Sequence, residues 1–194
     1  MARQIGLRDI HVAVIETDTT GGATYSTPTK LERAITAKLS PQSNTENIYS
    51  DDAVEDVITS FEGMEVEIEI NQLSLTSRAL LQGAKVIKGM LVENKNDLAP
   101  TVALGFKSKK ANGKYRYVWL LKGKFELTSD NYETEADKPK AQTASLKGTF
   151  YPRDFDGNYR FIADEDEIEI DTELITNWFK SVPTEPVEEA GIGE

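Results

Sequence analysis

The sequence predicts a mainly β protein in which two antiparallel sheets pack against each other as a sandwich or barrel, with one short α-helix at their flank and another near the C-terminus. Three observations predict this fold. Apolar and polar residues alternate with a period of two in most segments. Turn signals rich in Gly, Asn and Asp separate these segments, and only two short stretches favour a helix.

The first predicted strands lie at residues 9–16 and 30–39, where apolar residues fall on alternate positions. A polar segment, residues 17–28, joins them and contains two adjacent glycines, so we expect a hairpin with a long tip. Residues 40–61 are rich in Asn, Ser, Thr and Asp and have no clear periodicity. We therefore expect a long loop over 40–61, and structureless segments of this length inside a domain are typically functional or mobile.

A half-buried strand is predicted at residues 64–70, where valine and isoleucine alternate with glutamate. The interior helix that follows is short. Ser74 suits its N-cap and Gly83 suits the position after its C-terminus. Residues 84–92 then read as a strand or an extended connector.

The clearest hairpin pairs residues 101–109 with residues 114–121, and the Asn112-Gly113 dipeptide between them is typical of a type I′ turn. Each strand has one face of apolar or aromatic side chains. These are Val102, Leu104 and Phe106 on the first strand and Tyr115, Tyr117, Trp119 and Leu121 on the second.

Further short strands are predicted at residues 123–127, 144–151 and 159–163, and acid/isoleucine alternation predicts another at 167–171. Asp171 then suits the N-cap of a helix that contains Leu174, Ile175, Trp178 and Phe179. Proline at positions 183 and 186 ends this helix.

Length and composition bound the remaining possibilities. A chain of 194 residues suits one domain, which we place at residues 1–181, followed by an acidic tail at 182–194 that is expected to be disordered. The absence of cysteine excludes disulfides and thiolate chemistry, and the single histidine, His11, excludes chemistry that needs two imidazoles. No apolar run reaches the roughly 18 residues of a membrane span. We expect a soluble, intracellular, acidic globular protein with no membrane partner.

Negative charge is concentrated at the C-terminal end. The formal net charge is −11, and residues 162–194 contain eleven acids but only one base, Lys180. The rest of the chain is therefore almost neutral. This concentration of negative charge disfavours tight binding of free nucleic acid, because phosphate contacts depend on Lys and Arg.

The chain contains no motif that predicts an enzyme, a metal site or a cofactor. His11 lies within a predicted strand without a catalytic partner, so a structural role is favoured. The acidic run at 164–167 lacks the spaced ligands and central glycine of a calcium loop and is interpreted as a solvated acidic segment. No spacing singles out a carboxylate pair of the glycosidase type.

The hairpin around residue 112 is rich in bases interleaved with aromatic residues. Three interpretations are open: a core face with surface bases, a surface that stacks on single-stranded nucleic acid, or a contact in which the hairpin of one copy faces the acids of another. The third interpretation fits the charge distribution best. Its candidate residues are Lys107, Lys109, Lys110, Lys114 and Arg116.

The most specific block of the sequence runs from Val102 to Lys110, then from Asn112 to Leu120 and from Lys122 to Phe125. Weaker features lie, in order, on both sides of this block. They are Tyr25-Ser26-Thr27-Pro28 with Lys30-Leu31, Asn44-Thr45-Glu46 with Tyr49-Ser50-Asp51-Asp52, Leu80-Leu81-Gln82-Gly83, Gln142-Thr143 with Leu146, Gly148 and Phe150, and Trp178-Phe179. Together these segments resemble the major tail proteins that form the tail tube of long, non-contractile phage tails, in the group common in phages and prophages of Gram-positive bacteria.

The resemblance implies the tail-tube fold, in which subunits join their sheets edge to edge into hexameric rings and the rings stack into a hollow tube that conducts DNA during ejection. A closed ring and an open stack both need heterologous contacts. The segment at 40–61 is our candidate for the contact between rings. Its candidate residues are Asn44, Glu46, Tyr49, Asp51, Asp52, Glu55 and Asp56.

The alternating glutamates Glu65, Glu67 and Glu69 have two interpretations: a solvated sheet face, or a surface of the tube lumen that is kept negative so that DNA passes without sticking. The implied partners are other copies of the chain, a tape-measure protein, a tail-tip initiator and a tail terminator. The implied location is the virion tail after synthesis in the cytoplasm of the host bacterium.

Two alternatives remain open at this point. One is a tube protein of a related injection or secretion apparatus without DNA in its lumen. The other is a β-sandwich module that binds carbohydrate or a host surface, and it requires an exposed aromatic platform made of Tyr115, Tyr117 and Trp119.

Overall fold

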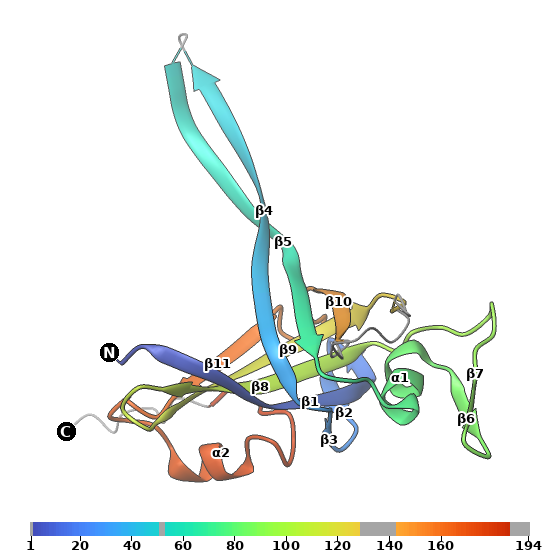
Figure 1. The fold of residues 1–194 in the computed structure, drawn as a ribbon. Helices are drawn as coiled ribbons and strands as arrows, with labels where there is room; N and C mark the ends of the chain where they lie inside the picture. The colour runs from blue at the N-terminus through green and yellow to red at the C-terminus, as the bar shows by residue number, and fades with distance from the viewer. Residues whose placement is uncertain (1, 51–52, 129–142, 187–194) are drawn as a thin grey trace, which may run out of the picture.

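A computed structural model describes residues 2–50, 53–128 and 143–186 (Figure 1). The strands are β1 (Gln4–Thr19), β2 (Gly22–Tyr25), β3 (Thr29–Lys30), β4 (Ala34–Ser50), β5 (Ala53–Ile70), β6 (Lys85–Ile87), β7 (Met90–Val92), β8 (Val102–Lys110), β9 (Tyr115–Phe125), β10 (Ala144–Phe150) and β11 (Arg160–Asp164). The helices are α1 (Leu75–Gln82) and α2 (Thr172–Asn177). Within the described part of the chain, neither helix has the length and apolar character needed to cross a bilayer.

The strands form two antiparallel sheets. The larger has nine strands in the order β2-β1-β8-β9-β10-β5-β4, with β3 paired to β1 and β11 paired to β9 beside this path. β6 and β7 form the second, two-stranded sheet. The predicted mainly β fold with antiparallel sheets and two short helices is therefore confirmed.

The large sheet folds over on itself at β9. Residues 116–120 of this strand pair with β11, whereas residues 123–125 pair with β10. Gly123 permits this close crossing, because a Cβ atom there would lie 2.4 Å from the ring of Phe150. As a result, β5 and β10 face β1 and β8, and the two layers around the core are parts of one sheet.

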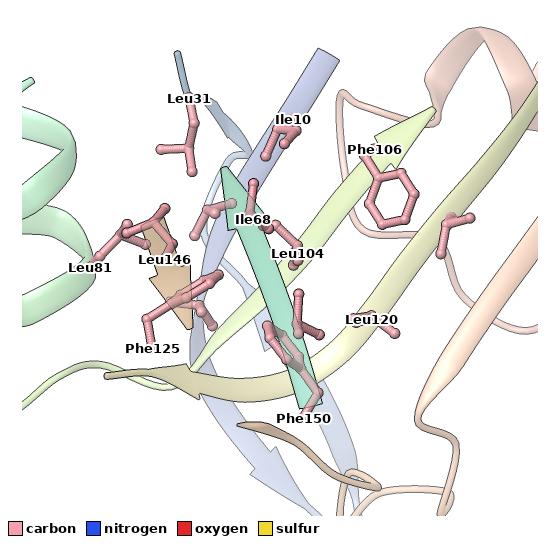
Figure 2. Close-up of a cluster of buried hydrophobic side chains, with 14 of the residues drawn as sticks. Ile10, Leu31, Ile68, Leu81, Leu104, Phe106, Leu120, Phe125, Leu146 and Phe150 are labelled. Carbon is pink, nitrogen blue, oxygen red and sulfur yellow. The ribbon is translucent and has the colours of Figure 1, made fainter. Parts of the chain in front are cut away.

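The main core fills the space between these layers, and Figure 2 shows its side chains converging from both of them. The alternation at residues 64–70 works as predicted, since the apolar residues of this stretch point inward and the glutamates point outward. The helix α1 closes one end with Leu81. The buried members of this core are Ile10, Val12, Leu31, Met64, Val66, Ile68, Ile70, Leu81, Val102, Leu104, Phe106, Val118, Leu120, Phe125, Leu146 and Phe150.

A second core lies on the opposite face of β8 and β9. Tyr117, Trp119 and Leu121 point into it, and α2 with the residues after it covers them. The indole N–H of Trp119 donates to the backbone oxygen of Trp178 at 2.8 Å. This hydrogen bond holds the segment after α2 against β9. The two apolar faces that the sequence predicts for this hairpin are thus both buried, on opposite sides of the sheet.

Both helices begin where the sequence predicts. Ser74 is the N-cap of α1, accepting from the N–H of Ser77 at 3.1 Å, and Gly83 follows the helix with the left-handed φ of 73°. Glu32 also accepts from the N–H of Ser74 and the hydroxyl of Ser77, which attaches α1 to the corner between β3 and β4. Asp171 caps α2 through the N–H of Glu173.

The pairing expected at the N-terminus is wrong. Of the predicted strand at 30–39, only Lys30 pairs with β1, as part of β3. From Ala34 onward the chain pairs with β5 over the whole length of β4, including residues 40–61. This segment is therefore a long hairpin and not an irregular loop; only its tip, residues 51–52, lies outside the described residues.

Two smaller expectations also fail. Gly113 has a φ of 87°, but Asn112 lacks the positive φ of a type I′ turn; the N–H of Gly113 donates to the oxygen of Lys110 at 3.1 Å, as in a type I turn followed by a left-handed glycine. Residues 167–171 form turns and not a strand. Their alternation has no sheet to pack on, and Ile168 is fully exposed.

Gly105 of β8 offers a test of the second core. A Cβ atom at this position would lie 2.6 Å from the indole of Trp119, so Gly105→Ala should lower the free energy of unfolding by about 1–3 kcal/mol. Urea denaturation followed by tryptophan fluorescence measures this change. Gly6→Ala is the matched control on the neighbouring strand, because its Cβ atom would meet only Lys109 Cβ at 3.9 Å. Equal stabilities of the two variants would contradict the packing argument.

Candidate assembly surfaces

A hairpin arm projects from the body of the molecule (Figure 1). Met64 is the buried core residue of β5 nearest to the arm, and Phe61, which stacks on Tyr159 at 4.2 Å between ring centroids, marks the base of the arm. Beyond it, β4 and β5 continue to pair from Ser43–Phe61 to Ser50–Ala53. We refer to residues 43–60 as the arm.

The side chains that the structure describes on the arm, at residues 43–45, 57, 59 and 60, are exposed. Two-stranded hairpins without a packed face are marginal in water, so this arm is suited to binding another surface. Of the residues expected to contact the next ring, Asn44, Glu46, Tyr49, Glu55 and Asp56 lie on the arm, whereas Asp51 and Asp52 lie outside the described residues.

The three alternating glutamates lie together on the solvent side of β5. Glu65 and Glu67 are exposed and Glu69 is half-buried. The register places Lys38 of β4 and Lys147 of β10 on either side of Glu67, and Lys147 Nζ lies 3.6 Å from Glu67 Oε1. The face is therefore mixed in charge and not purely acidic, which the sequence alone did not reveal. Its orientation toward a lumen stays a prediction.

The basic hairpin is engaged with acids of its own chain. Lys110 is only 1% exposed, and its ammonium group contacts Asp164 and, at 2.7 Å, Asp166. Arg116 Nη2 lies 2.8 Å from Asp164, and Lys114 Nζ lies 3.4 Å from Asp166. The expectation that Lys110 contacts a neighbouring copy is therefore wrong, because no neighbour can reach it.

The two remaining bases differ. Lys107 Nζ lies 2.8 Å from Asp9 and 4.9 Å from the ring centroid of Tyr115. Lys109 is half-buried and has no ion-pair partner in the described part of the chain. A contact of Lys109 with another copy stays a prediction.

The acidic run at 164–167 binds the basic hairpin and is not a solvated segment. We refer to the contacts that Asp164, Glu165 and Asp166 make with residues 110–117 as the clasp. Glu165 accepts from the N–H of Tyr115 and the hydroxyl of Tyr117, at 2.8 and 2.9 Å. Burial alone would raise the pKa of Asp164, but hydrogen bonds from Lys110, the N–H of Asp166 and Arg116 outweigh it and lower that pKa to about 2. The clasp therefore fastens the end of β11 to the tip of the β8–β9 hairpin.

The aromatic residues on β9 do not form an exposed platform. Trp119 is 0% exposed and Tyr117 is 7% exposed, both beneath the C-terminal cover. His11 belongs to the same region and stacks on Phe179 at 4.4 Å between ring centroids. The surface required by a glycan-binding module is thus absent from this strand.

The start of the predicted tail packs against the body. Pro183 is buried, Val182 joins the second core, and Glu185 accepts a hydrogen bond from the amide of Asn158 at 2.9 Å. The expectation of disorder is wrong for these residues. Residues 187–194 lie outside the described residues.

Four strands of the large sheet pair with a single neighbour in the described part of the chain: β4 with β5, β11 with β9, and β2 and β3 with β1. β4 and β11 are the longest of the four. Unpaired strand edges are templates for further strands, so each can accept another chain. Composition gives no signal for these edges, because they depend on the order of strands in the sheet.

A family model described as phage tail tube protein matches residues 3–178. No curated protein matches the chain.

The clasp predicts acid sensitivity. Asp164 has a folded pKa of about 2, below the ordinary value of 3.8, so its stabilising effect is complete above about pH 5 and is lost as pH falls toward 2. Unfolding near pH 3 should take up about one proton fewer in Asp164→Asn than in the unaltered chain. The slope of unfolding free energy against pH, from urea titrations at pH 2–5, measures this number. Glu16→Gln removes an exposed carboxylate as a control, and equal slopes for both variants would refute the assignment.

Proposed function

The chain belongs to the phage tail tube protein family, and from this premise we propose that its copies close into hexameric rings that stack into the conduit for DNA ejection. The family places the protein in the virion tail as a structural component, where it assembles with copies of itself and with other tail proteins. We further propose that these partners include a tape-measure protein, a tail-tip initiator and a tail terminator, and that synthesis takes place in the cytoplasm of the host bacterium.

The arm is the observation that carries this proposal. It projects well beyond the core, is paired along its length, and its described side chains at 43–45 and 59–60 are exposed. An element of this kind gains stability when a neighbour covers it. A contact between the arm of one ring and the body of the next is heterologous and open, and such contacts build filaments.

Ring closure requires a second, different contact. The open edges of β4 and β11 lie on different strands of the same sheet, so an edge of one copy can pair with a different edge of the next. Repeated rotation by the same angle then closes the ring. With the arm assigned to contacts between rings and the strand edges to contacts within a ring, the solvent side of β5 and β10 is left to face the lumen.

We propose that Glu65, Glu67 and Glu69 face the lumen together with the lysines beside them. A mixed surface suits DNA passage, because bases that already have carboxylate neighbours release fewer counterions on meeting phosphate. The fully acidic surface suggested by the alternation alone is not needed for this effect.

Truncation of the arm tests the contact between rings. The register pairs Thr45 with Thr59, so deletion of residues 46–56 leaves Val57 and Ile58 as a two-residue turn, and Val57→Asn with Ile58→Gly gives the turn a favourable sequence. The truncated chain should form rings but no tubes in negative-stain electron microscopy. Insertion of two glycines after Thr20, in the β1–β2 turn, is the control and should leave tubes intact. Long tubes from the truncated chain would refute the role of the arm.

Charge reversal tests the lumen. Replacement of Glu65, Glu67 and Glu69 by lysine should leave tubes intact, because these side chains point away from the core, but should make the tubes retain DNA at low salt. In a phage carrying the variant, DNA ejection and plaque formation should fall. Replacement of the same residues by glutamine is the matched control for loss of the carboxylates. Normal infectivity of the lysine variant would show that these residues do not face DNA.

A further inference from the structure

The β6–β7 hairpin exposes apolar side chains. Ile87 and Met90 are opposite each other across the hairpin and are 54% and 68% exposed, and Val92, two residues after Met90, lies on the same face at 41%. Lys85, opposite Val92, and Lys88 at the turn add positive charge. The sequence suggested only a strand or connector here.

Nothing in the described part of the chain covers this face. The hairpin forms a sheet of its own and touches the body through α1. An isolated two-stranded hairpin is marginal in water, and three neighbouring exposed apolar residues on one of its faces mark a contact surface. The hairpin therefore has the properties of an element that a partner completes.

A pocket suited to such side chains lies on another part of the molecule, between β11 and the C-terminal cover. Its volume is about 210 Å³, below the roughly 300–1,000 Å³ of a small-molecule site but large enough for an apolar side chain. Its apolar wall includes Phe161, Ile162, Ile170, Leu174, Trp178 and Pro183. Ile162 is 49% exposed on β11, which has an open edge.

The charges of the two surfaces are opposite. Glu167 lines the pocket, and Glu185 lies within the segment that forms one of its walls. Both are exposed. The hairpin supplies Lys85 and Lys88, so contact between the two surfaces would place lysines beside glutamates and apolar side chains within an apolar wall.

We infer that the β6–β7 hairpin of one copy docks into the pocket between β11 and α2 of a second copy, with Met90 and Ile87 as the inserted side chains. The two surfaces lie far apart on one chain, on opposite sides of the body in Figure 1, so a chain cannot satisfy its own pocket. The contact is heterologous and repeats from copy to copy. This inference rests on the proposed function and adds to it a contact between neighbours in one ring, since the arm points across the line that joins the two surfaces.

Disulfide trapping tests the contact, because the chain contains no cysteine. Met90→Cys and Ile162→Cys are prepared as separate variants, mixed, assembled and oxidised. We expect a crosslinked dimer in the mixture and at least about tenfold less in either variant alone. The control mixture combines Thr20→Cys, in the exposed β1–β2 turn, with Ile162→Cys and should give only background.

A charge exchange provides a second measurement. Lys88→Glu should reduce crosslinking at the Met90–Ile162 pair, and Glu167→Lys in the partner should restore it. Restoration distinguishes a direct contact from a general loss of folding, because each variant alone places like charges at the interface. Failure of the second change to restore crosslinking would count against this register.

Electron microscopy of the same samples separates this inference from the proposed function. Rings or tubes without the specific crosslink would overturn the hairpin contact and leave the tube assignment in place. The crosslink in samples that form neither rings nor tubes would support the contact and count against the tube assignment. Rings or tubes that also contain the specific crosslink would support both the hairpin contact and the tube assignment.

Discussion

The fold depends on burial of the β8–β9 hairpin on both of its faces. Val102, Leu104 and Phe106 point into the main core, and Tyr117, Trp119 and Leu121 point into the second core on the other side. Because protein interiors are close-packed, a hairpin buried on both faces restricts which side chains can pack against each face. β5 and β10 cover one face, and the segment containing α2 covers the other, so neither layer is free to shift independently.

This arrangement explains why the assembly surfaces lie at the periphery. The two cores use the apolar faces of the central strands, and the clasp at Lys110 neutralises the charges nearest to them. What remains for neighbours is the arm, the solvent side of β5 and β10, the β6–β7 hairpin and the open edges of β4 and β11. These surfaces lie outside both cores, so other copies can cover them without disturbing the fold.

The parts of the fold that a core dictates were predictable from the sequence. Alternation identified the strand at 64–70 and both faces of the β8–β9 hairpin, and local capping chemistry identified Ser74, Gly83 and Asp171. Where a segment does not pack on a core, the pattern of apolar and polar residues does not predict its structure. The arm carries no period-two signal because its described faces are exposed, and the alternation at 167–171 is misleading because Ile168 packs on nothing. Lys110 was placed on the surface because its acid partners follow 54 and 56 residues later in the chain, a separation that no local pattern reports.

The segments whose structure was least predictable from the sequence are also segments proposed to contact other copies. A segment whose structure cannot be deduced from its own chain lacks the burial that would specify it, and the missing burial has to come from another molecule. The arm and the β6–β7 hairpin are of this kind: each is a two-stranded element whose described side chains are mostly exposed, attached to the body at one end. Because such elements gain stability only on contact, their ordering depends on the presence of a neighbour. Subunits that carry them can therefore stay apart in solution and associate once a neighbour offers a complementary surface.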